Sequence, residues 1–454
     1  MKKEKDLRQY LSQQQEKFLE ELTLFCQQPS IAASGEGMEK MPLLVQDYLK
    51  GLGAEVEVYR VADSYPIIFA ELKSPRPKAP TLFIYNHYDV QPPDPLEAWT
   101  TPPFAPEVRH GHFYARGVGD NKGNLLSRLQ VIGAWQKVHG ELPLNIKWVI
   151  EGEEEIGSPH LQEFAEKYGY LWQDSDFCLW ETGGVNEKGE PILNLGMKGI
   201  VYLELSCHFN NYDLHSGLAA IADSPVWRLI QALNTLRDEK GQVLIRDFYE
   251  HRQPLRESEE EMLRQKDFDP ASFMASKGIQ RALVDPQDKV GFLKQMYLGG
   301  TVNICGIWGG FTQKGVKTIV PSQVRAKIDL RLVRGQKTDD IVQKLRRHLD
   351  SEGFSDIEIK LLASQEGGQS DITDFYIQET IKILRQTYQK EVDLNLTNLG
   401  SGPIYFLASQ FNIPVIQIGC GYPGSQIHAP DENVRLTDYW QAQRAFAALL
   451  ENWL

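Results

Sequence analysis

Polar side chains that could bind a metal ion or move a proton lie where several apolar, strand-like stretches of this sequence end. In open α/β sheets, ligands bind outside the carboxyl ends of the strands, so residues that follow the strands are expected to meet at one edge of the sheet. The residues concerned are His87 and Asp89 after LFIYN, Glu154 and Glu155 after IKWVI, Glu181 after FCLW, and His428 after PVIQIGCG and a short turn.

Metal ligation is the chemistry that this set of side chains favours. Imidazole and carboxylate groups together suit zinc, cobalt or manganese, and the lack of thiolates argues against a structural four-Cys zinc site. Asp120, in the loop ARGVGDNKGN, has two oxygens that could bridge two ions, although it also stands at a good helix N-cap position. Two dications would compensate the crowded carboxylates. Each feature taken alone is more typical of a polar loop, an acidic turn or a helix cap.

The elements that must position these residues alternate along the first two hundred residues. MPLLVQDYLKGLGAEVEVYRV predicts a helix, a glycine stop and a strand, and NKGNLLSRLQVIGAWQKVHG predicts a helix that ends at a glycine. TLFIYNHYDV, LPLNIKWVIEGE and DSDFCLWETGG each predict a strand. This alternation predicts an α/β fold, with a mostly parallel sheet flanked by helices.

The middle of the chain has a different pattern. GIVYLELSCHF and SQVRAKIDLRLV alternate apolar and polar residues in the manner of half-exposed antiparallel strands, with helical stretches between them. The last eighty or so residues return to a helix, a strand and a helix. We therefore predict an α/β domain (residues 1–197 and 369–454) that is interrupted by an inserted α+β domain with an antiparallel sheet (residues 198–368).

Composition narrows the classes of function. The chain has 454 residues, of which 42% are hydrophobic, and a formal net charge of −13, which disfavours nucleic acid or an anionic membrane as a partner. The N-terminal MKKEKDLRQYLSQQQEKFLEEL predicts an amphipathic helix rather than a signal peptide, and no apolar run is long enough to span a membrane. Five scattered cysteines favour a reduced, cytoplasmic protein.

Five short motifs carry a family resemblance. They are HYDVQPP from His87, ARGVGDNKG from Ala115, EEIGS from Glu154, DLHSG from Asp213 and HAPDENV from His428. In this order and at this spacing they resemble the co-catalytic zinc metallopeptidase family. That family includes carnosinases and related dipeptidases, aminoacylases, acetylornithine deacetylases and succinyl-diaminopimelate desuccinylases. The resemblance covers nearly the whole chain.

The resemblance implies a role for each residue at the strand ends. It implies two divalent metal ions, zinc before cobalt or manganese, and a water that they activate. Glu154 would be the general base, Asp89 would fix the tautomer of His87, and the peptide bond after Asp120 would be cis. The metal ligands would be His87 and Glu181 on one ion, Glu155 and His428 on the other, and Asp120 between them.

The resemblance also implies substrate-binding residues in the inserted domain, which would act as a lid and a homodimer contact. His215 of DLHSG would stabilise the oxyanion, within one chain or across the dimer, and Arg331 of DLRLV would bind the substrate carboxylate. Asn303 of TVNICG is a further polar candidate. The sequence departs from carnosinase-like members in the turn that begins at Gly400, GSGPIYF, which puts any contact of a serine side chain there in doubt.

Hydrolysis of an amide bond in dipeptides or short peptides is the function that we expect. The inserted domain is long, which favours a dipeptidase or a carboxypeptidase-like peptidase over a deacylase of N-acyl amino acids. A deacylase remains the alternative within the family. A catalytically silent relative that binds metal or peptide is the alternative from another class, and the presence of Glu154 with a full ligand set argues against it.

Overall fold

The computed structural model describes residues 6–453, which form two compact units. The first unit runs up to Leu195 and returns at Gln369–Asn395 and from Phe406 onward. The second unit comprises Gly196–Gly368 together with the short segment Leu396–Tyr405. The second unit is therefore built from two separate pieces of the chain.

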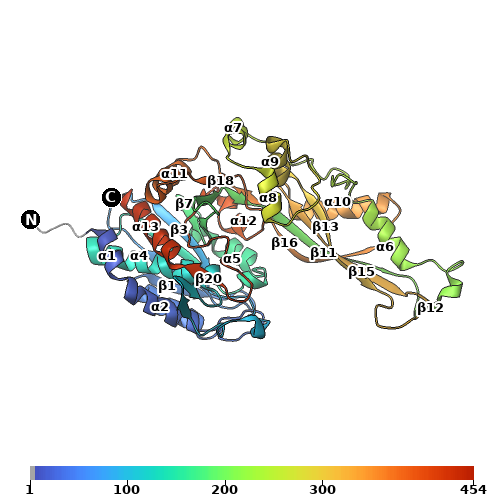
Figure 1. The fold of residues 1–454 in the computed structure, drawn as a ribbon, viewed down its shortest axis with the longest axis horizontal. Coiled ribbons are helices and arrows are strands. Elements are labelled where there is room, and N and C mark those ends of the chain that lie inside the picture. The colour runs from blue at the N-terminus through green and yellow to red at the C-terminus, as the bar shows by residue number, and fades with distance from the viewer. Residues whose placement is uncertain (1–5, 454) are drawn as a thin grey trace, which may run out of the picture. The chain divides into compact units, whose positions relative to one another are not determined.

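A six-stranded sheet forms the centre of the first unit (Figure 1). Four neighbouring strands, β6, β3, β7 and β19, run parallel, whereas β2 pairs antiparallel with β6 and the edge strand β1 pairs antiparallel with β2. All four residues of β7 are buried, as expected for a strand that is covered on both faces. The predicted α/β class is confirmed. The strands are, in order across the sheet, β1 (Glu55–Tyr59), β2 (Ile67–Leu72), β6 (Asn145–Glu151), β3 (Thr81–His87), β7 (Phe177–Trp180) and β19 (Val415–Gln417).

Helices flank this sheet. The longest, α4 (Gly123–His139), is buried over most of its length and packs against α13 (Leu436–Glu451), which also contacts α11 (Phe375–Tyr388). The N-terminal helix predicted from the sequence is divided at Gln14 into two, and its residues 1–5 lie outside the described part. The remaining helices of this unit that position its core are α1 (Leu7–Gln13), α2 (Gln15–Gln27), α3 (Met41–Gly51) and α5 (Leu161–Tyr168).

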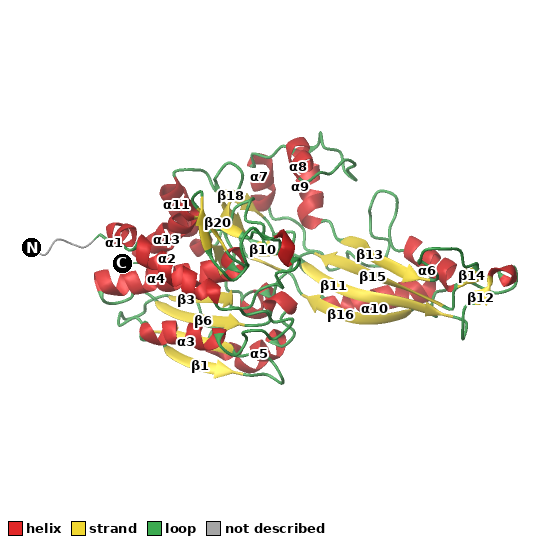
Figure 2. Ribbon diagram, turned by 60° about the horizontal axis from the view of Figure 1, so that its bottom comes forward, coloured by secondary structure: helices red, strands yellow, loops and turns green. Residues whose placement is uncertain are grey.

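The second unit is built on a four-stranded antiparallel sheet (Figure 2). Along β11, buried residues alternate with half-buried ones, which is the pattern expected when only one face of a sheet is covered. Helices α6 (Pro225–Asn234) and α10 (Thr338–Ser351) cover that face and share its apolar core. The antiparallel strands predicted here are confirmed. In order across the sheet they are β13 (Thr301–Gly309), β15 (Gln323–Leu332), β11 (Gly199–His208) and β16 (Glu358–Gln365).

Short elements complete the two units. In the second unit a two-stranded pair, β12 (Leu214–His215) and β14 (Ile319–Val320), carries the DLHSG motif. Within residues 6–453, no helix combines the length and the apolar character that crossing a membrane requires. Three further helices of the second unit are α7 (Glu257–Gln265), α8 (Pro270–Ser276) and α9 (Lys289–Leu298).

Candidate metal centre

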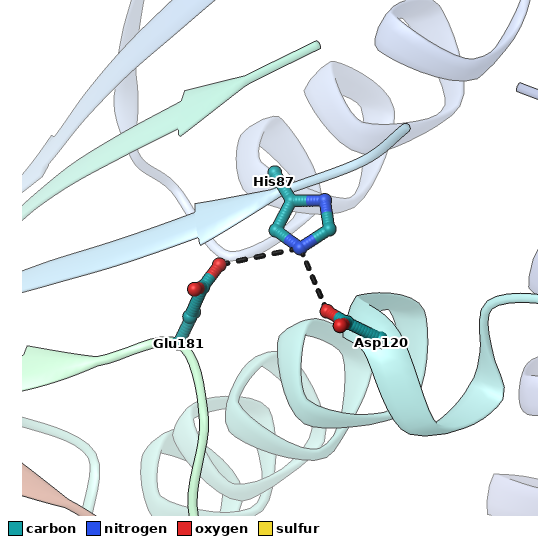
Figure 3. Close-up of side chains that lie close together, drawn as sticks. All are labelled: His87, Asp120 and Glu181. Carbon is teal, nitrogen blue, oxygen red and sulfur yellow. Dashed lines mark hydrogen bonds and ion pairs between the residues drawn. The ribbon is translucent and has the colours of Figure 1, made fainter. Parts of the chain in front are cut away.

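Three side chains from different elements of the first unit meet at the carboxyl edge of its sheet (Figure 3). His87 is the last residue of β3, Glu181 directly follows β7, and Asp120 lies in the turn that precedes α4. The Nε2 atom of His87 lies 2.9 Å from Asp120 Oδ1 and 3.2 Å from Glu181 Oε2. The parallel pairing of β3 with β7 explains this meeting, because it brings the ends of both strands to one edge.

A second group shares Asp120 with the first. The Nε2 atom of His428 lies 3.4 Å from Asp120 Oδ2 and 3.1 Å from Glu155 Oε2. Each of the two groups offers one ligand atom per residue, and within a group these atoms lie within 4.8 Å of one another. Asp120 therefore turns one carboxylate oxygen toward each group, which is the arrangement required of a bridging ligand.

The charges of this centre shift the proton affinities of its members. Burial would lower the pKa of His87, but the surrounding carboxylates, Glu181 foremost, raise that pKa well above its usual value. Hydrogen bonds to Asp120 and Glu155 raise the pKa of His428 to about 10. Burial would raise the pKa of Asp120, but hydrogen bonds from the two histidines hold it well below its usual range. In the absence of metal, the protonated histidines thus balance part of the negative charge of the carboxylates.

Two buried carboxylate oxygens fit a metal ion. Glu155 Oε1 and Glu181 Oε2 accept no well-directed hydrogen bond from residues 6–453, although Glu181 Oε2 has His87 Nε2 nearby at 3.2 Å. Burial raises the pKa of Glu181 to about 8, because an ionised carboxylate away from water is costly unless a positive charge balances it. Imidazole and carboxylate donors together are typical of zinc, cobalt and manganese sites. The donor set therefore fits two divalent ions.

Metal binding is expected to release protons. At about pH 7 the metal-free His87 and His428 carry protons, because their pKa values are raised, and an imidazole must lose its proton to bind a metal. We expect about three protons to be released near pH 7 when both sites fill, two from the histidines and one from Glu181, whose pKa is raised to about 8, and we expect metal affinity to rise with pH. Calorimetry in buffers of different ionisation enthalpy measures this number. A pH-independent affinity with no proton release would contradict the protonated metal-free centre.

Asp89 and Glu154 lie beside the ligands. Asp89 is fully buried, and its Oδ1 atom lies 3.2 Å from His87 Nδ1, the ring nitrogen that faces away from Asp120. The same carboxylate accepts hydrogen bonds from the backbone N–H groups of Glu154 and Glu155, at 3.3 and 2.9 Å. Asp89 therefore orients His87 and anchors the turn that carries the two glutamates. Burial, followed by the charge of Glu181, raises the pKa of Glu154 well above its usual value.

The interpretation of Asp120 as a helix cap is wrong. Helix α4 begins at Gly123 and its N-cap residue is Lys122, whereas Asp120 has extended backbone angles (φ −139°, ψ 96°). Its carboxylate contacts histidines instead of helical N–H groups. The peptide bond between Asp120 and Asn121 is cis, as the resemblance implied.

Glu432 holds the turn that carries Asp120, and sequence reasoning missed this role. Its buried carboxylate accepts hydrogen bonds from the backbone N–H groups of Gly117 (2.9 Å), Gly119 (2.8 Å) and Asp120 (3.1 Å). Its charge is balanced by Arg116, whose Nη1 lies 2.7 Å away. The only signal was its place in HAPDENV, where nothing distinguishes it from its acidic neighbour Asp431.

The Glu432→Gln substitution is expected to loosen the metal centre. It leaves Arg116 buried without a counter-charge, which should lower the free energy of unfolding by about 3 kcal/mol. Since the turn that carries Asp120 loses an acceptor, metal affinity should fall by about tenfold or more. Thermal unfolding and metal titration measure the two effects. Asp431→Asn is the matched control, because Asp431 bonds to Thr100, and equal metal affinity in the two variants would contradict the role.

A buried arginine supports the other side of the centre and was also not predicted. Arg128 lies within α4 and donates hydrogen bonds to the backbone oxygen of Glu181 at 3.0 Å and to Asn86 Oδ1 at 2.7 Å. The side chain of Asn121 donates to the same Glu181 oxygen at 3.0 Å. An arginine in a predicted helix normally faces solvent, so the sequence carried no signal for this position.

The three predicted substrate-binding residues belong to the second unit. His215 is exposed on β12, and its Nδ1 accepts a hydrogen bond from Gly217 N at 3.1 Å. On β15, the Nη1 atom of Arg331 donates to Ser401 Oγ at 2.8 Å. Asn303 on β13 donates to Asp329 Oδ2 at 2.9 Å. The serine in the turn after Gly400, whose contacts the sequence left in doubt, therefore bonds to Arg331.

Known proteins resemble this chain over most of its length. The Beta-Ala-His dipeptidase of Mus musculus is 25% identical over 428 residues, which cover 90% of this chain and 86% of that protein. The Cys-Gly metallodipeptidase DUG1 of Candida albicans is 30% identical over 358 residues, or 74% of this chain and 73% of that protein. The solved structure of an M20 family metallo-carboxypeptidase from Sulfolobus solfataricus matches with a TM-score of 0.89 and 32% identity, covering 96% of this chain and 99% of that one.

A family model agrees with these relatives. The model described as peptidase family M20/M25/M40 matches residues 83–452, a range that includes all the residues of the candidate metal centre. The family resemblance predicted from the five motifs is confirmed. This chain is a metal-dependent peptidase, and it belongs to peptidase family M20/M25/M40.

Proposed function

We propose that this chain hydrolyses the amide bond of dipeptides or short peptides at a centre of two divalent metal ions. The observation that carries the proposal is the shared carboxylate of Asp120, with Oδ1 at 2.9 Å from His87 and Oδ2 at 3.4 Å from His428. Glu181 would complete the first site and Glu155 the second. The relatives named dipeptidases support a short peptide as the substrate.

Zinc is the metal that we propose, with cobalt and manganese as outcomes that the same donor set allows. When bound, two such ions would polarise the scissile carbonyl and lower the pKa of a water molecule. The chain's own part is to hold the ligands in place. Asp89 does so for His87, and Glu432 does so for Asp120.

Glu154 is the proposed general base. It would accept a proton from the attacking water and pass it to the leaving amine, and its raised pKa suits a group that must both gain and lose a proton. Glu155, the next residue, contacts His428 and would stay ionised as a ligand. Asp89 holds both glutamates in place, because its two carboxylate oxygens accept hydrogen bonds from their backbone N–H groups.

Three residues of the second unit are the proposed substrate contacts. Arg331 would bind the substrate carboxylate, since its guanidinium matches a carboxylate fork and is only half-buried. His215 would donate a hydrogen bond to the developing oxyanion, and its exposed imidazole supports this role. Asn303 is the least constrained candidate, because its amide nitrogen is already bonded to Asp329.

A hydrolysis screen tests the proposed function. Dipeptides and N-acetyl or N-succinyl amino acids are offered to the protein with zinc, manganese or cobalt supplied separately. We expect release of amino acids from dipeptides. Turnover of the acylated amino acids alone would make the protein a deacylase, and binding of metal without turnover of any substrate would make it a silent relative.

We propose that the second unit forms a homodimer contact. Large apolar side chains are exposed near the DLHSG motif, among them Tyr212 (70% exposed), Ile221 (85%) and Val316 (93%), and such groups mark association surfaces. If His215 acts across the dimer, mixing His215→Ala with Glu154→Ala protein should restore about a quarter of the activity by random pairing. No recovery in verified mixed dimers would place His215 in its own chain's site.

A reducing compartment, the cytoplasm, is the location that we propose. All five cysteines are free thiols, and four of them are buried. Structural disulfides would be expected in an oxidising compartment.

A further inference from the structure

Lys198, at the start of the second unit, is a buried cation without an acidic partner. Its side chain is 6% exposed, and its Nζ donates a hydrogen bond to the backbone oxygen of Gly299 at 2.8 Å. Among residues 6–453, no carboxylate lies within ion-pair distance of this ammonium group. An ammonium group has three donors, so the contact with Gly299 leaves donors available.

A second cation faces the same region. Burial, and then the positive charge of Arg331, lower the pKa of Lys198 to about 8. The turn near Gly400 joins them, because the backbone N–H of Lys198 donates to Gly400 O at 3.1 Å and Arg331 Nη1 donates to Ser401 Oγ at 2.8 Å. An acid, Asp329, lies beside Arg331, with its Oδ1 3.5 Å from Arg331 Nε.

This arrangement has more positive than negative charge, which a bound anion would balance. Burying a charge without a counter-charge is costly, and the chain nevertheless keeps Lys198 and Arg331 near one turn, with Asp329 of β15 as the acid beside Arg331. Lys344, another buried lysine of the second unit, has acidic neighbours instead. Its Nζ lies 2.7 Å from Asp340 and 3.1 Å from Glu250.

We propose that Lys198 binds a second anionic group of the substrate, the side-chain carboxylate of a C-terminal aspartate or glutamate. The inference rests on the proposed function, in which Arg331 takes the α-carboxylate. A guanidinium fork is matched by one carboxylate, which leaves the ammonium of Lys198 for a separate anion. The hydroxyl of Ser401, which accepts a hydrogen bond from Arg331, can itself donate to a substrate carboxylate. The substrate class is thus peptides that end in an acidic residue.

Paired substrates test this specificity. The ratio of kcat/KM for Ala-Glu to that for Ala-Gln cancels effects on folding and on the metal centre. We expect the wild type to favour Ala-Glu by about tenfold or more, and the Lys198→Met variant to lose that preference. Lys198→Arg should keep most of it. Lys344→Met is the matched control, a buried lysine of the same unit whose replacement should leave the ratio unchanged.

The outcomes separate this inference from the proposed function. Hydrolysis of Ala-Gln and Ala-Glu with equal efficiency, or a ratio that Lys198→Met does not change, would overturn the role of Lys198 while the peptidase stands. If no dipeptide is hydrolysed with any metal, calorimetric titration with free L-glutamate and L-glutamine tests the role of Lys198 independently of peptidase activity. Tighter binding of glutamate that is lost in Lys198→Met supports the acidic subsite, and equal binding of the two amino acids overturns it.

Discussion

Replacing Glu154 with glutamine is expected to lower kcat on a dipeptide by about a thousandfold while both metal ions stay bound. Glutamine has nearly the same volume but cannot accept a proton, so water activation and protonation of the leaving amine both lose their carrier. The proposed metal ligands are other residues, and the backbone bond from residue 154 to Asp89 does not depend on the side chain. Steady-state kinetics together with the metal content of the purified variant measure the two expectations.

The control for this substitution is Glu163→Gln. Glu163 lies on α5 and is paired on the surface with Lys167, so the same chemical change there should leave kcat and metal content as in the wild type. Retained turnover in Glu154→Gln would remove Glu154 as the base. Loss of metal together with turnover would instead make it a ligand or a structural support of the centre.

Replacing Asp120 with alanine is expected to cost the protein both metal ions and all measurable peptidase activity. One carboxylate faces both groups, so its removal takes a ligand from each site at once and leaves the two histidines without their shared acceptor. His428→Ala should remove the ion of one site only, because His428 belongs to a single group. Metal analysis should therefore give two ions for the wild type, one for His428→Ala and none for Asp120→Ala.

An exposed histidine provides the control for these metal analyses. His110 lies in the hairpin turn between β4 (Glu107–Arg109) and β5 (His112–Tyr114), outside both groups. His110→Ala should keep two ions. One remaining ion in Asp120→Ala would show that the two sites do not share this residue, and two ions in His428→Ala would exclude that histidine as a ligand.

The strand ends of the parallel sheet could be predicted from the sequence because each strand and the polar residue at its end lie next to each other in the chain. A buried apolar run that ends in His87, or just before Glu181, predicts both a strand and the point where that strand ends. Parallel pairing of β3 with β7 then places these two strand ends at the same edge of the sheet. Glu155 follows in the same way from the end of β6. The motif resemblance added the functions of His428 and Asp120, which pattern alone left among loops and helix caps.

The supporting residues could not be predicted because their partners are backbone atoms far away in the sequence. Glu432 bonds to N–H groups more than three hundred residues earlier, and no side-chain pattern records such a contact. Arg128 bonds to the carbonyl oxygens of strand ends from within a helix, where periodicity alone suggests an exposed position. The contact between Ser401 and Arg331 likewise joins two segments that lie far apart in the chain, so the sequence could not predict it.

The segment Leu396–Tyr405 limits how this protein can be re-engineered. It joins the second unit although it lies beyond the long stretch Gly196–Gly368 in the chain, and its Ser401 contacts Arg331 there. A chimera that exchanges only the long stretch with a relative would combine one protein's arginine with the other's turn. Grafts intended to transfer substrate preference should therefore carry both pieces, and a recombinant fragment limited to the long stretch would lack part of its own fold.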